Sequence, residues 1–350
     1  MTLNVFRILL WPWRNYRRQG SNSAAAPPAS EMSLEQYEML APHQIVYDGT
    51  TEVVYATPSV FTKWRVDSLF TKEPDTIEWI KGFQPGEVFV DIGANVGMYT
   101  IWAAKTRGVR TFSFEPESQN YALLYRNIVM NGLTEDVVAY CLALSDTTSY
   151  SLLHLSQFQL GGSCHSFGEM IDHRLEYRDT KLAQGCISTT LDTLVADGVL
   201  PVPNHIKIDV DGLEHKVLAG CRDALADHRL KSVLVEINTN LEPHRKIIAD
   251  MQALGFDYSE QQVAQARRTE GAFKGVGNYV FQRLTTRLVP DCQCADAQVS
   301  IRAHLCRKRF PRRFLHGIAR QLAGPVRTDQ PCRYRTRSER CLPRALCDAL

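Results

Sequence analysis

An acid and two glycines interrupt an apolar run of the sequence, in VFVDIGANVGMYT at positions 88–100. Asp91 ends the run, Gly93 and Asn95 follow it, and Gly97 stands where a helix is expected to begin. Ligands of open parallel sheets bind beyond the carboxyl ends of the strands, so this turn is a predicted ligand site. Glycines let a ligand approach the backbone closely, and the N-terminus of a helix offers free N–H groups.

The glycine spacing and the acid argue against a dinucleotide. Folds that bind pyrophosphate use G-x-G-x-x-G, whereas this turn has G-x-x-x-G. A carboxylate at Asp91 would repel a pyrophosphate but would attract a ligand that carries an ammonium group. S-adenosylmethionine has an amino-acid end and no phosphate, so it fits both features and is the predicted cofactor.

Two later strand ends extend this prediction. FSFEPE at 112–117 brings Glu115 to a strand end, where a carboxylate can accept both hydroxyls of an unphosphorylated ribose. LALSD at 142–146 ends a third predicted strand, and its backbone with Ser145 or Asp146 is expected to meet the adenine. The predicted cofactor residues are therefore Asp91, Gly93, Asn95, Gly97, Glu115, Ser145 and Asp146.

The segment IKIDVDGLEHKVLAG at 206–220 carries the candidate catalytic residues. Strand alternation puts Lys207 and Asp209 on one side, with Asp209 at the carboxyl edge, facing the expected position of the methyl group. Asp209 is the first candidate for the base, Lys207 for its orienting or pKa-lowering partner, and Glu236, at the next strand end, for a second acid. The alternatives are a structural ion pair for Lys207 and a structural role for Glu236.

The acceptor is expected near Asp211 and near the glycine-rich loop LGGSCHSFG at 160–168. His165 in this loop is a second candidate base, with ordinary polar surface as the alternative. Asp209, Asp211 and Glu214 also bring acids together around a turn, but the glycine comes too early for an EF-hand loop. The favoured interpretation of these acids is a turn and a helix cap, and no metal is predicted.

Alternating β-branched runs and helical patterns predict an α/β fold with a doubly wound, mostly parallel sheet. Helices are expected at 116–131 and 242–254, and an antiparallel closing hairpin is expected from strands at 256–258 and 278–282. The other expected strands are 88–91, 110–114, 137–142, 206–210 and 233–237.

The predicted domain covers residues 45–284. Residues 1–44 combine the apolar segment VFRILLWPW, a basic cluster and the linker GSNSAAAPPAS, and they are predicted to be a disordered extension. Residues 285–350 lose the periodicity and hold six of the ten cysteines, and 13 of the 40 Lys and Arg residues fall within 301–350. This segment is predicted to be a disordered basic tail.

The sequence has no cleavable signal pattern and no apolar run near the roughly 20 residues of a membrane span. We therefore expect a cytoplasmic protein, with a weak contact between its N-terminal aromatic and basic segment and a membrane surface as an added option. The basic stretch RKRFPRRF at 307–314 accompanies no folded basic module, so no specific nucleic acid is expected. The oligomeric state stays open.

Together these motifs resemble the FkbM family of S-adenosylmethionine-dependent methyltransferases. The resemblance spans roughly residues 50–282 and rests on KEPDTIEWI, VFVDIGANVGMYT, FSFEPE, LALSD, STTLDTL, IKIDVDGLEHKVLAG and LVEIN, in the family's order. It implies a seven-stranded Rossmann-like class I methyltransferase fold, O-methylation of a small molecule or sugar unit, and Glu73 near the substrate. The family often has Glu where this chain has Asp211.

Two other functions stay open at this point. An oxidoreductase linked to NAD(P) or flavin has a similar sheet but a different glycine spacing. A non-catalytic tethering protein could keep the cofactor fold, although it has no need of Asp91, Glu115 and Asp209 at three strand ends.

Overall fold

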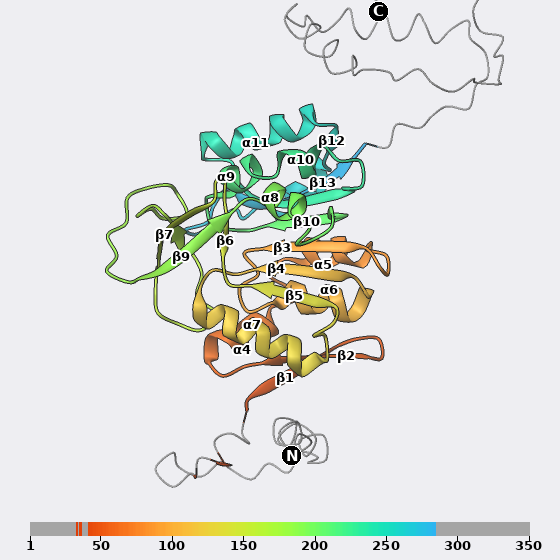
Figure 1. The fold of residues 1–350 in the computed structure, drawn as a ribbon, viewed down its shortest axis with the longest axis vertical. Helices are drawn as coiled ribbons and strands as arrows, with labels where there is room; N and C mark the ends of the chain where they lie inside the picture. Colours follow the sequence, from red (N-terminus) through yellow and green to blue (C-terminus); the bar gives the residue numbers. More distant parts are fainter. Residues whose placement is uncertain (1–32, 34, 37–40, 285–350) are drawn as a thin grey trace, which may run out of the picture. The chain divides into compact units, whose positions relative to one another are not determined.

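The computed structural model describes residues 33, 35–36 and 41–284 (Figure 1). The predicted extension up to residue 44 lies mostly outside the described residues, and the predicted tail at 285–350 lies wholly outside them. The first strand, β1 (His43–Asp48), begins just before the expected start of the domain.

A seven-stranded sheet in the order β12-β13-β11-β10-β3-β4-β5 forms the centre of the fold. Its pairs are parallel except those of β13, which runs antiparallel to β11 and β12. The doubly wound sheet and its closing hairpin are thus confirmed. After β3, the chain adds β4 and β5 on one side of the sheet, and after β10 it adds β11, β12 and β13 on the other side. The topological switch point therefore lies between β3 and β10. The strands are β3 (Val88–Ile92), β4 (Arg110–Phe114), β5 (Val137–Tyr140), β10 (His205–Ile208), β11 (Ser232–Asn238), β12 (Phe256–Asp257) and β13 (Val276–Arg283).

Helices cover both faces of this sheet because its strands are apolar on both sides. Phe89 on β3 packs into the core under α5 (Pro74–Lys81), α6 (Met98–Arg107) and α7 (Ser118–Asn131). Val90, its neighbour, packs on the opposite side. The helices of that opposite side are α8 (Leu191–Ala196), α9 (Glu214–Ala219), α10 (Arg222–Ala226) and α11 (Glu242–Ala253), while α12 (Glu260–Ala266) lies beside β13.

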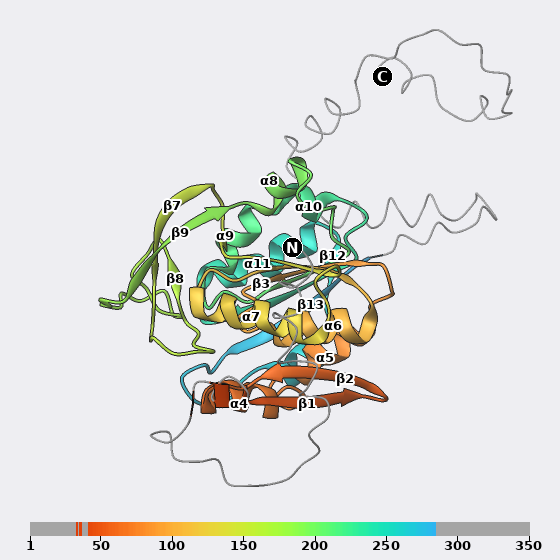
Figure 2. The same ribbon diagram turned by 60° about the horizontal axis from the view of Figure 1, so that its bottom comes forward.

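An N-terminal hairpin adds an outer layer that the sequence did not predict. Its strands β1 and β2 (Thr51–Ala56) lie outside α6 and α7 (Figures 1 and 2). Buried amides on α7 fix it, since Asn127 Oδ1 and Asn131 Oδ1 accept the N–H groups of Ala56 at 2.8 Å and Val54 at 2.9 Å. The hairpin leads into α4 (Val60–Asp67), which thereby reaches the carboxyl edge of the sheet.

A second sheet of four strands stands beside the first, in the order β6-β9-β7-β8 (Figure 1). Its strands are β6 (Ala143–Leu144), β7 (Ser149–His154), β8 (Ser166–Phe167) and β9 (Ala183–Thr189). The expected strand at 137–142 is therefore too long. It ends at Tyr140, and residues 143–144 pair with β9 because the chain has left the central sheet.

The longest described helix, α7, has 14 residues. None of the helices in the described part of the chain has the length and hydropathy to cross a membrane. The expected cytoplasmic location stays a prediction.

Candidate active site

The turn between β3 and α6 lies against the end of β10. Gly93 has a φ of +79°, and a Cβ placed there would lie 1.9 Å from the backbone carbonyl oxygen of Asp209. Only glycine permits both the left-handed conformation and this close approach. The turn and Asp209 therefore meet at the switch point of the sheet.

The place where this turn meets Asp209 is here called the junction. A cavity with apolar walls, here called the apolar cavity, opens on one side of it. The turn residue Gly93 lines it together with polar side chains: Asn95, Glu115, Ser145, Ser163, His165, Asp209 and Asp211. Its walls include Phe114, Pro116, Leu142, Leu144, Leu153 and Phe167. Within the described residues no lysine or arginine lines it. Because phosphate sites need cations or clustered N–H donors, this lining fits an uncharged nucleoside better than a dinucleotide.

Glu115 reaches the apolar cavity from the end of β4. Its carboxylate accepts the backbone N–H of Asn95 at 2.8 Å and that of Glu117 at 2.9 Å. Burial raises the pKa of Glu115 to about 7. Each carboxylate oxygen keeps a further acceptor position, so Glu115 can still accept hydroxyl groups as the ribose prediction requires.

Asp91 lies beneath the turn rather than on a cavity wall. It is 1% exposed and accepts a hydrogen bond from Thr100 Oγ1 at 2.6 Å, while its Oδ1 has no hydrogen-bond partner. Burial raises the pKa of Asp91, with Lys207 opposing the shift. A buried acceptor without a partner at this position fits the expected ammonium group, although Asp91 itself does not line the apolar cavity.

Two other predicted cofactor residues do not line the cavities. Gly97 is the N-cap of α6 at a φ of +83° and packs against Leu124. Asp146 is exposed, and its Oδ1 accepts a hydrogen bond from Ser145 Oγ at 3.2 Å. Of the segment expected to meet the adenine, residues 142–145 line the apolar cavity and Asp146 does not.

A second cavity, here the charged cavity, opens toward α4 on the other side of the junction. It shares Gly93, Asn95, Ser163, Asp209 and Asp211 with the apolar cavity. Its other lining residues are aromatic, cationic and acidic side chains: Phe61, Trp64, Arg65, Lys72, Glu236, Arg268 and Phe273. The predicted catalytic and substrate acids Asp209, Asp211 and Glu236 thus lie together.

Lys207 and Asp209 form a buried ion pair. Lys207 Nζ donates to Asp209 Oδ2 at 2.9 Å, and the lysine side chain is 2% exposed. Burial works against the charge of Lys207, but Asp209, Asp91 and Glu73 outweigh it and raise the pKa of its ammonium group. Burial also disfavours the Asp209 carboxylate, yet Lys207 and Lys72 lower its pKa, so Asp209 is ionised at neutral pH.

Glu236 and Glu73 share the cation Arg268. Arg268 Nη2 lies 3.0 Å from Glu236 Oε1 and 3.6 Å from Glu73 Oε1. Burial, together with the neighbouring charge of Asp209, raises the pKa of Glu236 well above its ordinary value. Glu73 is buried, pairs with Lys72 at 2.6 Å and accepts from Tyr99 Oη at 2.9 Å, so it supports cavity residues without lining the cavity itself.

The predicted loop at 160–168 passes over the site and is held from several elements. Gly162 O accepts from Asn95 Nδ2 at 2.6 Å and from Asn120 Nδ2 at 3.0 Å. Asp211 Oδ2 accepts the N–H of Cys164 at 2.6 Å. His165 points into the apolar cavity rather than the charged one, and burial lowers its pKa.

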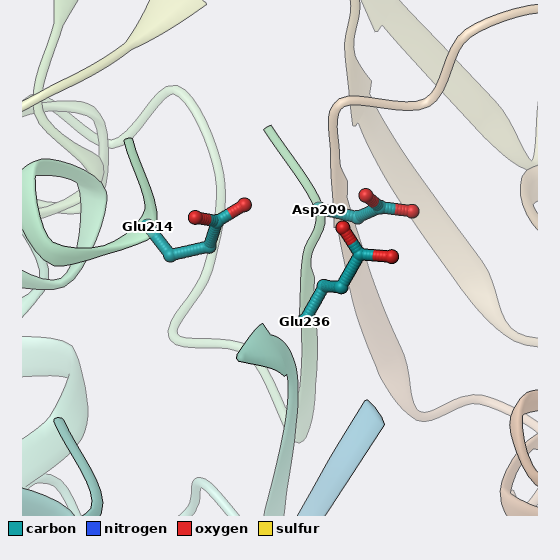
Figure 3. A group of neighbouring side chains, drawn as sticks. All are labelled: Asp209, Glu214 and Glu236. Atoms are coloured by element: carbon teal, nitrogen blue, oxygen red, sulfur yellow. The ribbon is translucent and has the colours of Figure 1, made fainter. Parts of the chain in front are cut away.

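Three acids lie close enough to suggest a metal site. The nearest oxygens of Asp209, Glu214 and Glu236 lie within 4.8 Å of one another (Figure 3). However, Glu214 accepts the N–H groups of Val210 and Gly212 at 2.9 and 3.0 Å, as expected for a turn cap. Lys207 and Arg268 already neutralise the other two acids. All three acids therefore already have hydrogen-bond or ion-pair partners within the protein.

Sequence reasoning missed the cationic and aromatic lining of the charged cavity. Arg65 and Trp64 lie on α4, Arg268 and Phe273 follow α12, and Lys72 precedes α5. The only usable signal was Lys72 in the KEPDTIEWI motif. The described fold is that of a class I S-adenosylmethionine-dependent methyltransferase.

Comparisons with known proteins agree with this class. Residues 91–258 match the family described as "Methyltransferase FkbM domain". The chain is 26% identical over 190 residues to "Hexuronic acid methyltransferase AglP" of Haloferax volcanii, covering 54% of this chain and 72% of that protein. It is 29% identical over 217 residues to "31-O-demethyl-FK506 methyltransferase FkbM" of Streptomyces tacrolimicus, covering 54% and 83%. Among solved structures, M. jannaschii TYW2 in complex with AdoMet aligns over 70% of this chain and 88% of its own, with 14% identity and a TM-score of 0.35.

The family-model match and the two curated relatives thus support an FkbM-family methyltransferase, as the motifs predict. It is an enzyme whose cofactor is S-adenosylmethionine. The distant structural likeness to TYW2 has no bearing on the substrate.

Proposed function

We propose that this methyltransferase transfers a methyl group to an oxygen atom of a small molecule or sugar unit. The observation that carries the proposal is the meeting of the apolar and charged cavities at five shared residues, Gly93, Asn95, Ser163, Asp209 and Asp211. A cofactor held in the first cavity and an acceptor held in the second would face each other there. The names of the two curated relatives, a hexuronic acid methyltransferase and a demethyl-FK506 methyltransferase, support this class of acceptor.

Each side of the junction has a distinct part in this proposal. Glu115, Ser145 and the Gly93–Asn95 turn would hold the nucleoside, and Asp91 would fix the turn from beneath. When bound, S-adenosylmethionine supplies a methyl group on a positively charged sulfur. The protein's main contribution is alignment of the acceptor oxygen, which can lower the barrier by about 7–11 kcal/mol.

Asp209 and Glu236 would have different roles toward the proton of the acceptor hydroxyl. Asp209 is kept ionised by Lys207, so it can accept a hydrogen bond from the acceptor hydroxyl and orient it. A carboxylate with a lowered pKa is a weak base, whereas the raised pKa of Glu236 makes its ionised form the stronger base of the pair. Glu236 thus takes a larger part than the sequence alone predicts.

The test is calorimetric titration of the full-length protein with S-adenosylmethionine, S-adenosylhomocysteine and NADH. The first two are expected to bind and NADH is not, because no cation lines the described apolar cavity. Asp209→Asn should keep the affinity for S-adenosylhomocysteine and lose methyl transfer to a sugar or small-molecule acceptor found by screening. NADH binding alone would favour the oxidoreductase, and no nucleotide binding would favour the tether.

A further inference from the structure

One cation of the charged cavity has no acidic partner. The other two cations of its lining, Lys72 and Arg268, each pair with a carboxylate, at 2.6 and 3.0 Å, and the nearby Lys207 pairs with Asp209 at 2.9 Å. Arg65 instead donates from Nε and Nη2 to the neutral carbonyl oxygen of Gly161, at 2.8 and 2.5 Å. Among the described residues no carboxylate forms an ion pair with it.

The position of Arg65 makes this charge accessible to ligands. Arg65 lines the charged cavity with Phe61 and Trp64. It also lines a smaller cavity beneath the Gly93–Asn95 turn, together with Lys72 and Tyr99. The bond to Gly161 uses one side of the guanidinium, and the edge formed by Nη1 and Nη2 stays available for a two-point contact.

Burial makes the positive charge of Arg65 energetically unfavourable without a counter-ion. It lowers the pKa of Arg65, and the more distant Asp211, Asp209 and Glu73 only partly offset that effect. A cationic side chain that is partly desolvated and has no counter-ion is stabilised most by an anion with two coplanar oxygens.

We propose that Arg65 is the carboxylate-binding residue of this site, an inference that rests on the proposed function. Two ligands could supply the carboxylate: the amino-acid end of the cofactor, or an acidic acceptor such as a uronic acid. The aromatic rings of Phe61 and Trp64, stacked at 5.5 Å beside Arg65, offer a flat surface for an acceptor ring. Trp64 is 45% exposed, so this surface is open to a ligand.

The cofactor source is tested by calorimetry on the full-length wild type and Arg65→Gln. S-adenosylhomocysteine carries the amino-acid end, and 5′-methylthioadenosine shares its nucleoside but lacks the carboxylate. If the cofactor supplies the anion, Arg65→Gln loses about 10- to 100-fold in affinity for the first ligand and little for the second. Lys63→Gln is the matched control, because Lys63 lies on the same helix but outside these cavities and pairs with Asp67.

The acceptor source is tested with saturating S-adenosylhomocysteine, by ligand-observed NMR titration of D-glucuronate and D-glucose. If the acceptor supplies the anion, Arg65→Gln loses a similar factor for glucuronate while its affinity for S-adenosylhomocysteine is unchanged. Arg65→Lys keeps the charge without the planar fork, so it should also weaken carboxylate binding, and it serves as the second variant if Arg65→Gln does not fold.

Unchanged affinity of both Arg65 variants for S-adenosylhomocysteine and glucuronate would overturn the proposal and leave the proposed function intact. Failure of the wild type to bind S-adenosylhomocysteine would overturn the proposed function, and the inference with it.

Discussion

Replacing Lys207 by methionine should expose how much the buried ion pair at the centre of the site contributes. The substitution keeps the volume of the side chain but removes the charge that compensates Asp209, Asp91 and Glu73. Removing one partner of a buried pair typically costs about 3–5 kcal/mol. Asp209 keeps some contact with solvent, its side chain being 22% exposed, so we expect a loss near the lower end, about 3 kcal/mol at pH 7.

The loss of unfolding free energy in Lys207→Met should become smaller as the pH falls. In the wild type the pKa of Asp209 is lowered, so its contribution to stability is present above the unfolded value and is lost as the pH falls through the folded value. In Lys207→Met burial acts without this compensation and the pKa of Asp209 rises. The difference in unfolding free energy between wild type and variant should therefore narrow as the pH falls from 7 toward 4.

The assay is urea unfolding of wild type, Lys207→Met, Asp209→Asn and the double variant. The double variant should lose less than the sum of the single losses, with a coupling of about 1–3 kcal/mol. Lys246→Met is the surface control, since its pair with Asp250 is exposed and should contribute less than about 0.5 kcal/mol. A loss below about 1 kcal/mol for Lys207→Met, or a difference that does not narrow at low pH, would refute the reasoning.

Three further outcomes are expected. Gly93→Ala should lose about 2–5 kcal/mol of unfolding free energy in urea, from its positive φ and the contact with Asp209, whereas Gly86→Ala, with φ +82° and open space, should lose only about 1–2 kcal/mol. The affinity for S-adenosylhomocysteine should rise in calorimetry as the pH increases through about 7 and Glu115 ionises, and Glu115→Gln should abolish that rise. Burial disfavours the Glu87 carboxylate, but hydrogen bonds from the Gln84 N–H, Lys231 and His205 lower its pKa to about 2. Glu87→Gln should therefore lose about 2–3 kcal/mol of unfolding free energy at pH 7, and this loss should fade from pH 4.5 down to the folded pKa; an equal loss at low pH would contradict a stabilising role of the Glu87 charge.

Much of the central sheet could be predicted because its strands leave a local pattern. Val88–Ile92 and Ser232–Asn238 are short apolar runs that end in acids or amides, and helices with clear stops connect them. Gly132 in the left-handed conformation ends α7, as its position after the apolar stripe predicts. In the second sheet, β6 and β8 have only two residues each, too few to show any alternation.

The acids of the site could be predicted for the same reason, but their partners could not. Asp91, Glu115 and Asp209 stand at strand ends, where a linear pattern locates them. Arg65 and Arg268 reach the same junction from α4 and from the segment after α12, more than 200 residues apart in the chain. Only the packing of the N-terminal hairpin on α7, through Asn127 and Asn131, brings α4 to the site.

The pleat of the strands explains why the two cavities differ in chemistry. Asp91, Lys207 and Ser113 lie in one register across β3, β10 and β4, and they face the side of α6. Ile92, Ile208 and Phe114, one residue later, face the opposite side and supply apolar surface. Because side chains alternate along a strand, buried polar and charged side chains face one side of the sheet and apolar side chains face the other where these strands end. Under the proposed function, a nucleoside and a polar acceptor would approach the junction from opposite faces of the sheet, and the alternation in IKID is the sequence feature that contributes to this division.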